Sequence, residues 1–245
     1  MKQLIILLSI VFCSLTILGQ NVTDSQGRKQ GKWVKYYDNG KVMRYTGQFK
    51  DDKPYGKFVY YYESGEVQTV LEYQEDGSAL AKTYFTHGSL MAKGAYVDQQ
   101  KDGVWWYFSA DKLLIAKENY KLGKLDGKSY KFFPTEMGAQ PVILEEVNYE
   151  DGLAQGEWKR FYKDGKIQVK GKYLNGLQNG ECIWYTTSGK AEIVGYFLNG
   201  KKNGQWRYYD TNGEYTTKFF VKDNELTGEI LEKYLEAKKM EQENQ

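Results

Sequence analysis

The chain has 245 residues and a formal net charge of +2, from 34 basic and 32 acidic side chains that are spread along its whole length. This even spread argues against nucleic acid as a partner, because recognition of a phosphate backbone needs a concentrated basic face. Mean hydropathy is −0.68, yet the chain holds 22 Tyr, 11 Phe and 6 Trp. Amphipathic rings must therefore supply much of the apolar burial.

The chain opens on a hydrophobic leader. A basic start precedes an apolar run from Leu4 to Leu18, which ends in the small residue Gly19 and then polar sequence. This pattern predicts a signal peptide over residues 1–19, and hence an exported protein, periplasmic or extracellular. The run is shorter than the roughly 20 residues that span a bilayer, so an uncleaved anchor is the weaker interpretation.

The two cysteines add little to this interpretation. Lipoprotein attachment at Cys13 is disfavoured, because the bulky Phe12 stands directly before it. After cleavage only Cys182 remains, so the mature chain cannot form an internal disulfide.

Contact with a membrane surface is also disfavoured, because it would require a basic face with apolar rings.

Residues 20–228 form an array of repeats with a period near 24 residues. Each copy opens on a glycine, and one degenerate copy begins at Ala79. The opening glycines are Gly31, Gly56, Gly103, Gly127, Gly156, Gly180, Gly204 and Gly228.

Each repeat reads as a β-hairpin. Two turn signals recur in every clear copy, such as Asp164-Gly165 and Asn175-Gly176, where glycine can take the positive φ of a tight turn. Stretches rich in Tyr, Trp, Phe, Val, Ile and Thr lie between the turns, and these side chains suit a pleated surface. We therefore expect an all-β fold of about eight stacked hairpins.

Aromatic residues recur at fixed offsets from the opening glycine. Offsets five and seventeen are nearly always aromatic, and offset two is often Trp. Stacked hairpins would align these positions into ladders of rings, which we expect to be the core. Second-row rings alternate to the other face. The candidate binding surface consists of Tyr37, Tyr62, Phe85, Tyr162, Trp106 and Trp184.

Two segments depart from the repeat. The copy that starts at Gly127 has extra residues over 134–141, which predicts a longer loop in place of its first turn. Residues 229–245 carry apolar side chains at helical spacing and then a charged tail, so we expect a helical cap or tail there. A short helix would pack over the last hairpin and cover its open strand edge. A helix that recruits a partner is the alternative.

The sequence indicates no catalytic residues, no metal site and no cofactor. The single histidine, His87, falls on a predicted turn, and one histidine with one mature cysteine leaves no set for a triad or a zinc site. The pairs Glu145 and Glu146, and Asp51 and Asp52, are predicted to lie in turns or at strand ends as solvated charge. We therefore do not expect an enzyme.

The segment from Gly171 to Gly189, GKYLNGLQNGECIWYTTSG, resembles a MORN repeat, and in particular its bacterial variant. The resemblance extends over about Gly31 to Gly228, with departures at Ala79 to Gly103 and at Gly127 to Gln155. It implies an elongated, solenoid-like, twisted antiparallel sheet used for association with proteins or with phospholipid. Many bacterial relatives are labelled antitoxins, and the family supplies no catalytic residues.

These observations favour a non-catalytic, exported scaffold that binds another protein of the cell envelope through an aromatic-rich sheet face. A carbohydrate-binding module of the envelope is one alternative, because sugars stack on aromatic hairpins. Antitoxin-like binding of a partner protein is another. The sequence leaves the oligomeric state open.

Overall fold

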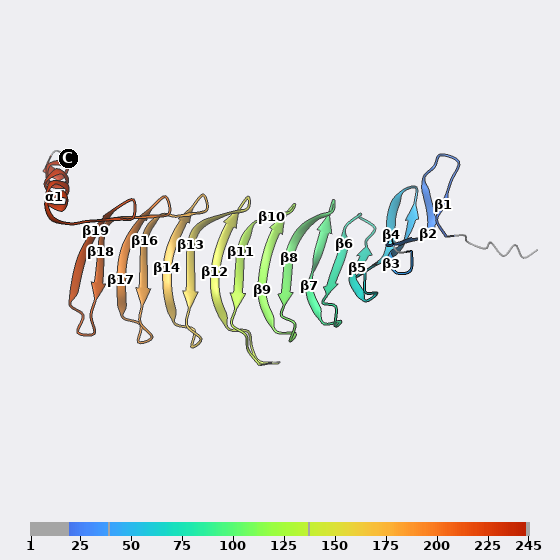
Figure 1. The fold of residues 1–245 in the computed structure, drawn as a ribbon, viewed down its shortest axis with the longest axis horizontal. Coiled ribbons are helices and arrows are strands. Elements are labelled where there is room, and N and C mark those ends of the chain that lie inside the picture. The colour runs from blue at the N-terminus through green and yellow to red at the C-terminus, as the bar shows by residue number, and fades with distance from the viewer. Residues whose placement is uncertain (1–19, 39, 137, 244–245) are drawn as a thin grey trace, which may run out of the picture.

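The computed structural model describes residues 20–38, 40–136 and 138–243. The predicted leader, residues 1–19, lies outside them. The described chain forms one long antiparallel sheet of 20 strands followed by a single helix (Figure 1). The predicted all-β, elongated and solenoid-like fold is confirmed.

The elements follow one another in a simple order. They are β1 Val22–Thr23, β2 Lys29–Tyr36, β3 Met43–Lys50, β4 Lys53–Tyr61, β5 Val67–Tyr73, β6 Ala79–Tyr84, β7 Leu90–Val97, β8 Gln100–Phe108, β9 Leu114–Lys121, β10 Lys124–Leu125, β11 Gly127–Phe132, β12 Ile143–Glu150, β13 Leu153–Phe161, β14 Ile167–Leu174, β15 Leu177–Gln178, β16 Gly180–Tyr185, β17 Ala191–Leu198, β18 Lys201–Tyr209, β19 Tyr215–Val221, β20 Asn224–Leu226 and α1 Gly228–Glu243.

Two kinds of turn alternate along the sheet. Between repeats, Asn175 and Gly176 both have positive φ, at 51° and 81°, as the two central residues of a type I′ hairpin turn require. Within a repeat, the Gly165 amide donates to the Tyr162 carbonyl at 2.9 Å and the Tyr162 amide to the Lys166 carbonyl at 2.8 Å, so Gly165 closes a longer turn. Both turn signals in the sequence are therefore used.

The opening glycines have a different role from the turn glycines. Gly56 lies inside β4 with a φ of 63°, and the register shifts there, because Thr46 pairs with Val59 while Gln48 pairs with Tyr55. The opening glycine thus forms a β-bulge. The bulge requires positive φ, which glycine adopts without steric strain because it has no Cβ atom. The degenerate copy has Ala79 at this position, and its strand pairs with β5 without a register shift.

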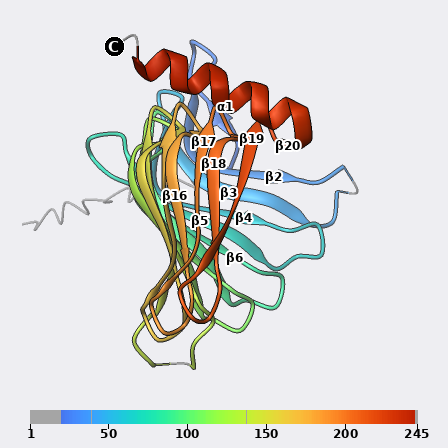
Figure 2. The ribbon, with the colours of Figure 1, turned by 90° about the vertical axis from the view of Figure 1, so that its left-hand side faces the viewer.

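The sheet twists along its length. Strands β7 to β19 run side by side in Figure 1, whereas the N-terminal strands are turned relative to them, as the view along the array shows (Figure 2). In the described chain no second layer of strands or helices covers either face. The core therefore lies on the surface of a single sheet, where neighbouring side chains bury one another.

The C-terminal helix is present, but it does not cover the last strand edge. Helix α1 has no buried residue, and it leaves Ile230 and Leu235 67% and 42% exposed. Its ring contact with the sheet joins Tyr234 to Phe219, with centroids 6.2 Å apart. The prediction that this helix packs over the hairpin is therefore wrong, and the short β20 pairs only with the end of β19. Within the described residues, no helix is long and apolar enough to span a bilayer.

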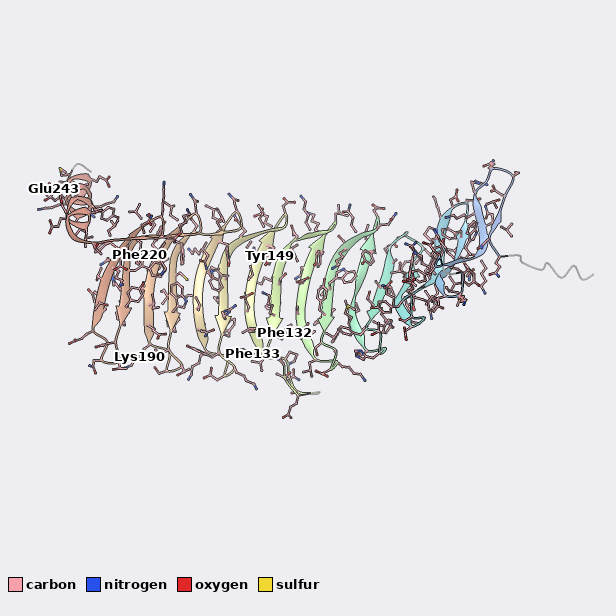
Figure 3. All side chains as sticks on the ribbon, in the orientation of Figure 1. Phe132, Phe133, Tyr149, Lys190, Phe220 and Glu243 are labelled. Atoms are coloured by element: carbon pink, nitrogen blue, oxygen red, sulfur yellow. The ribbon has the colours of Figure 1, made fainter. Side chains whose placement is uncertain are left out.

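The longer loop of the fifth copy is confirmed. The Phe133 amide donates to the Val142 carbonyl at 2.9 Å and closes the loop at its base. The loop extends past the neighbouring turns at one long edge of the sheet, next to Phe132 and Phe133 (Figure 3). It lengthens the edge without disturbing the strands on either side.

Candidate interaction surface

The two faces of the sheet differ in chemistry because strand residues alternate between them. The aromatic face carries offsets two and four, together with the residue that pairs across the strands with the opening glycine, which is at offset seventeen in most copies. It contains Phe58, Tyr60, Tyr73, Tyr96, Trp105, Tyr107, Tyr120, Tyr149, Trp158, Tyr173, Trp184, Phe197, Trp206, Tyr208 and Phe220. The opposite face, here called the charged face, carries offset three and its cross-strand neighbours.

Rings on the aromatic face contact each other from one hairpin to the next. Trp206 lies edge-on to Phe197 and to Phe220, at 5.2 and 5.8 Å between centroids. Trp105 and Tyr96 repeat the arrangement at 5.0 Å. Edge-to-face pairs at this separation are favourable beyond the area that they bury. Phe58, Trp105 and Trp206 are only 2% exposed, although no second layer covers them in the described chain.

Three lysines lie over rings of this face, and they are Lys29, Lys101 and Lys202. The Lys202 ammonium lies 4.5 Å from the Trp206 ring and 5.0 Å from Phe220. Lys29 takes the same place over Trp33 and Phe49. Cations on ring faces are attracted by the ring quadrupole. The aromatic face is therefore amphipathic, with apolar rings and charged groups at its solvent boundary.

A polar cluster interrupts the rings in the fourth copy. Lys101 Nζ donates to the Tyr107 hydroxyl at 2.7 Å, the hydroxyls of Tyr107 and Tyr120 lie 3.2 Å apart, and Tyr120 donates to Glu118 at 2.6 Å. Burial, with the hydrogen bond to Glu118, raises the pKa of Tyr120 to about 12. Burial also raises the pKa of Tyr107 and lowers that of Lys101. This chain of contacts satisfies both tyrosine hydroxyls.

Glu145 and Glu146 are in neither of the predicted places, a turn or a strand end, because both lie within β12. Glu145 belongs to the aromatic face and is bound by Lys131 at 2.7 Å and by Arg160 at 3.1 Å. Burial raises the pKa of Glu145, but these two cations outweigh that effect and hold it below its usual value. Glu146 points to the charged face and pairs with Lys128.

The charged face alternates ion pairs with isolated rings. The Lys117 ammonium lies 5.2 Å from the Trp106 ring and 5.8 Å from that of Tyr130. Lys170 lies 5.6 Å from the ring of Tyr185, which belongs to the offset-five column. Offset five thus lies on the face opposite to offset seventeen. The two columns that the sequence suggested as one core are separated by the sheet.

The predicted binding residues at the turns serve to join neighbouring hairpins. The hydroxyls of Tyr37, Tyr62 and Tyr162 donate to the carbonyls of Tyr61, Tyr84 and Tyr185 in the next copy, at 2.6, 2.7 and 2.7 Å. Phe85 has no hydroxyl and stacks on His87, with centroids 5.4 Å apart. All four rings are only partly exposed. These contacts give them a structural role along one long edge.

Trp106 and Trp184 lie on different faces. Trp106 belongs to the charged face, whereas Trp184 lies 5.5 Å from Trp206 on the aromatic face. The six predicted residues are thus divided among one edge and two faces, and they do not form a continuous surface. The alternation of side chains along each strand could have revealed this division, since the two tryptophans differ in offset by one.

Two segments of the chain match a family model. Residues 29–51 and 154–175 match the MORN repeat variant, and each covers one hairpin of the array just described. These two hairpins are repeats of the MORN variant type.

Comparison with other proteins adds no further relationship. A search of curated proteins found no match. Among solved structures, an S. aureus TarM mutant in complex with Fondaparinux, alpha-GlcNAc-glycerol and UDP is 15% identical, over 46% of this chain and 19% of that one, with a TM-score of 0.21. A TcdB2-TccC3-TEV structure is 9% identical, over 84% of this chain and 14% of that one, with a TM-score of 0.23. The chain spans less than a fifth of either.

His87 and Ser89 connect a turn to the next hairpin through the Ala110 carbonyl. Ser89 Oγ lies 2.7 Å from His87 Nε2 and 3.0 Å from the Ala110 carbonyl, which accepts a hydrogen bond from it. Ser89 is 6% exposed, so this hydroxyl is turned into the structure. The described residues contain no cluster of three or more His, Cys, Asp or Glu that could hold a metal ion.

The cysteine of the described chain, Cys182, is also buried. It is 2% exposed and occupies the offset-two position between rings of the aromatic face. Burial raises the pKa of its thiol to about 12. A thiol with so high a pKa is protonated at neutral pH and is a poor nucleophile.

Proposed function

We propose that this repeat protein is a non-catalytic, exported scaffold that binds another protein of the cell envelope through its aromatic face. The observation that carries the proposal is the ladder of half-buried rings on a face that no other element of the described chain covers. Tyr60, Tyr107 and Tyr208 lie along this ladder in three separate copies and stay partly accessible.

The chemistry of this face suits a protein partner. Tyr and Trp supply a large contact area at low cost in conformational entropy, and both are enriched in protein interfaces. The lysines over the rings and the Lys131–Glu145–Arg160 group add charges that a partner's side chains can pair with. Because the rings already bury one another, the face is pre-organised and a partner need not order it.

Two neighbouring threonines in β19 allow the choice of face to be tested. Thr216 pairs with Tyr208 on the aromatic face, and Thr217 pairs with Arg207 on the charged face. Both are exposed, so an arginine fits at either position without disturbing the core. In a pull-down from an envelope extract, Thr216→Arg should release the partner while Thr217→Arg retains it. Equal retention by both variants would argue against the aromatic face.

Export requires a separate test, since it rests on the sequence of the leader. We expect the mature protein to begin at Gln20 and to be recovered outside the cytoplasm, as mass spectrometry of fractionated cells can determine. Cys13→Ser should leave this location unchanged. A cytoplasmic protein that retains residues 1–19 would contradict the proposal.

A further inference from the structure

The aromatic face is hollowed at the degenerate copy. A hollow of about 540 Å³ lies between β4 and the turn that follows β7, and Tyr60, Tyr73, Tyr96, Leu71, Pro54 and Asp98 are among the residues that line it. A space of this size is in the range of small-molecule sites. In this copy the side chain at offset two is Ala81, the smallest in a column that is mostly Trp or Phe.

The hollow arises from two substitutions in the repeat pattern. The degenerate copy has Ala79 where others have the opening glycine, and Ala81 where most others have Trp or Phe. Both alanines are 2% exposed, and Ala81 pairs across the strands with Leu71. Ala79 lines the hollow between the rings of the second copy and Tyr96, and Ala81 packs next to it against Ala92 and Trp105.

Comparison with the fourth copy shows what else is missing. There, Lys101 and Glu118 bind the hydroxyls of Tyr107 and Tyr120. The equivalent tyrosines of the second copy are Tyr60 and Tyr73, and the equivalents of the lysine and the glutamate are Pro54 and Leu71. The second copy thus keeps both tyrosines and lacks both of the charged groups that satisfy them.

The hydroxyls at the hollow are consequently open to a ligand. Within the described part of the chain, the hydroxyls of Tyr60, Tyr73 and Tyr96 make no hydrogen bond to another protein group. Burial raises the pKa of all three, so each is a neutral phenol that can both donate and accept. Apolar ring faces and free hydroxyls therefore meet in one place.

We propose that this hollow binds a pyranose ring of a neutral glycan, whose apolar face stacks on the tyrosine rings while its hydroxyls pair with those of Tyr60, Tyr73 and Tyr96. An apolar side chain from a protein would desolvate the three phenols without pairing them, which is costly. The residues that line the hollow include no cation to meet an anionic ligand, because Pro54 replaces the lysine, and Asp98 stands at the rim. A neutral molecule with several hydroxyls satisfies the groups that are present.

The test uses the purified protein on an array of neutral and anionic oligosaccharides, with N-acetylchitotriose and maltotriose as soluble probes in calorimetry. We expect saturable binding of a neutral oligosaccharide. Tyr60→Phe and Tyr73→Phe should each weaken it about 3- to 10-fold, because each removes one hydrogen-bonding hydroxyl and keeps the ring. The matched controls Tyr107→Phe and Tyr120→Phe, in the fourth copy, should leave the affinity unchanged.

A second variant adds charged groups to the site instead of removing a hydroxyl from it. Pro54→Lys with Leu71→Glu introduces the two charged groups of the fourth copy beside Tyr60 and Tyr73, and we expect it to abolish glycan binding. Absence of binding to every neutral glycan would overturn the proposal, as would affinities that are unchanged in both phenylalanine variants. A preference for anionic glycans would also overturn it. So would binding of a protein to these tyrosines that free sugar does not displace.

The glycan site and the protein-binding face can fail independently. Thr216 lies in β19, far along the array from β4 to β8 (Figure 1), so Thr216→Arg should leave glycan affinity intact. Tyr60→Phe and Tyr73→Phe are scored on the purified protein with oligosaccharide alone, so their result does not depend on a protein partner. Each proposal thus has a measurement of its own.

Discussion

Gly195 lies directly beneath the indole of Trp206, and a Cβ atom built on it would come within 2.2 Å of Trp206 Cδ2. The backbone of Gly195 does not have positive φ, so space alone requires glycine there. Gly47 and Phe58, and Gly94 and Trp105, repeat the arrangement. Where the ring is replaced by Ala81, the residue opposite is Leu71. Large and small side chains thus alternate across neighbouring strands.

Substitution of Gly195 should therefore destabilise the array. We expect Gly195→Ala to cost about 1–3 kcal/mol, because the added methyl overpacks a position that the indole already fills. Urea denaturation followed by tryptophan fluorescence would measure the shift in midpoint. The control is the double variant Gly195→Leu with Trp206→Ala, which copies the natural Leu71 and Ala81 pair. It should be more stable than Gly195→Leu alone. No recovery in the double variant would refute size complementarity as the cause.

The tyrosine hydroxyls at the long edge should contribute to the coupling between hairpins. Tyr162→Phe removes the hydrogen bond to the Tyr185 carbonyl, and we expect it to cost about 0.5–1.5 kcal/mol. Amide hydrogen exchange should show the loss most strongly in β16, next to that carbonyl. Tyr36→Phe is the control, since Tyr36 is 46% exposed. Equal effects of the two variants would show that the edge hydrogen bonds do not couple the hairpins.

Stability should fall in alkali. Burial raises the pKa of Tyr120 to about 12, and it also raises the pKa of Tyr60, Tyr73 and Tyr96. A raised folded-state pKa stabilises the protein below the unfolded value near 10, and this contribution is lost as pH rises from there toward 12. The lowered pKa of Lys101 has the opposite effect on the pH dependence of stability, but it comes from a single group and the tyrosine effect comes from several.

Tyrosinate absorbance and circular dichroism, recorded together between pH 9 and 12, would check this dependence. We expect the buried tyrosines to ionise only as the sheet unfolds. If these tyrosines titrated near pH 10 in a sheet that stays folded, the burial of their hydroxyls would be contradicted.

Adjacent glutamates on opposite faces provide a matched pair. Glu145→Gln should cost about 1 kcal/mol at neutral pH, because it breaks a partly buried group with Lys131 and Arg160. Glu146→Gln, which breaks a single pair with Lys128, should cost about 0.5 kcal/mol or less. The lowered pKa of Glu145 means that its contribution is present above its unfolded value and is lost as pH falls. Denaturation midpoints at pH 7 and pH 3 would test both statements, and equal costs at pH 7 would contradict them.

Much of the fold was predictable, because its determinants are local. Turn residues such as Asn175 and Gly176 specify tight hairpins, and the recurring aromatics specify pleated strands. The bulges at Gly56, Gly103, Gly156 and Gly204 were not predicted, because a glycine in sequence does not show whether it turns the chain or deforms a strand. The helix at Gly228 was predicted, but its position depends on contacts between distant residues, such as Tyr234 and Phe219.

The candidate surface was harder to predict than the fold. Tyr162 was expected to be exposed, but the carbonyl that its hydroxyl binds belongs to the next copy, and sequence spacing does not reveal that contact. The division of Trp106 and Trp184 between two faces follows from their offsets and could have been predicted. The hollow at the degenerate copy was visible in the sequence only as the missing opening glycine and Trp of that copy, and its free hydroxyls became evident only beside the satisfied pair of the fourth copy.

Site-specific photo-crosslinking would test the proposed binding face most directly. A crosslinking residue is placed at Thr83 or Thr216 on the aromatic face, and at the neighbouring Lys82 or Thr217 on the charged face. After irradiation in cells, we predict one common protein adduct from positions 83 and 216 and none from 82 and 217. Adducts that form only from 82 and 217 would contradict the assignment of the aromatic face as the partner-binding surface.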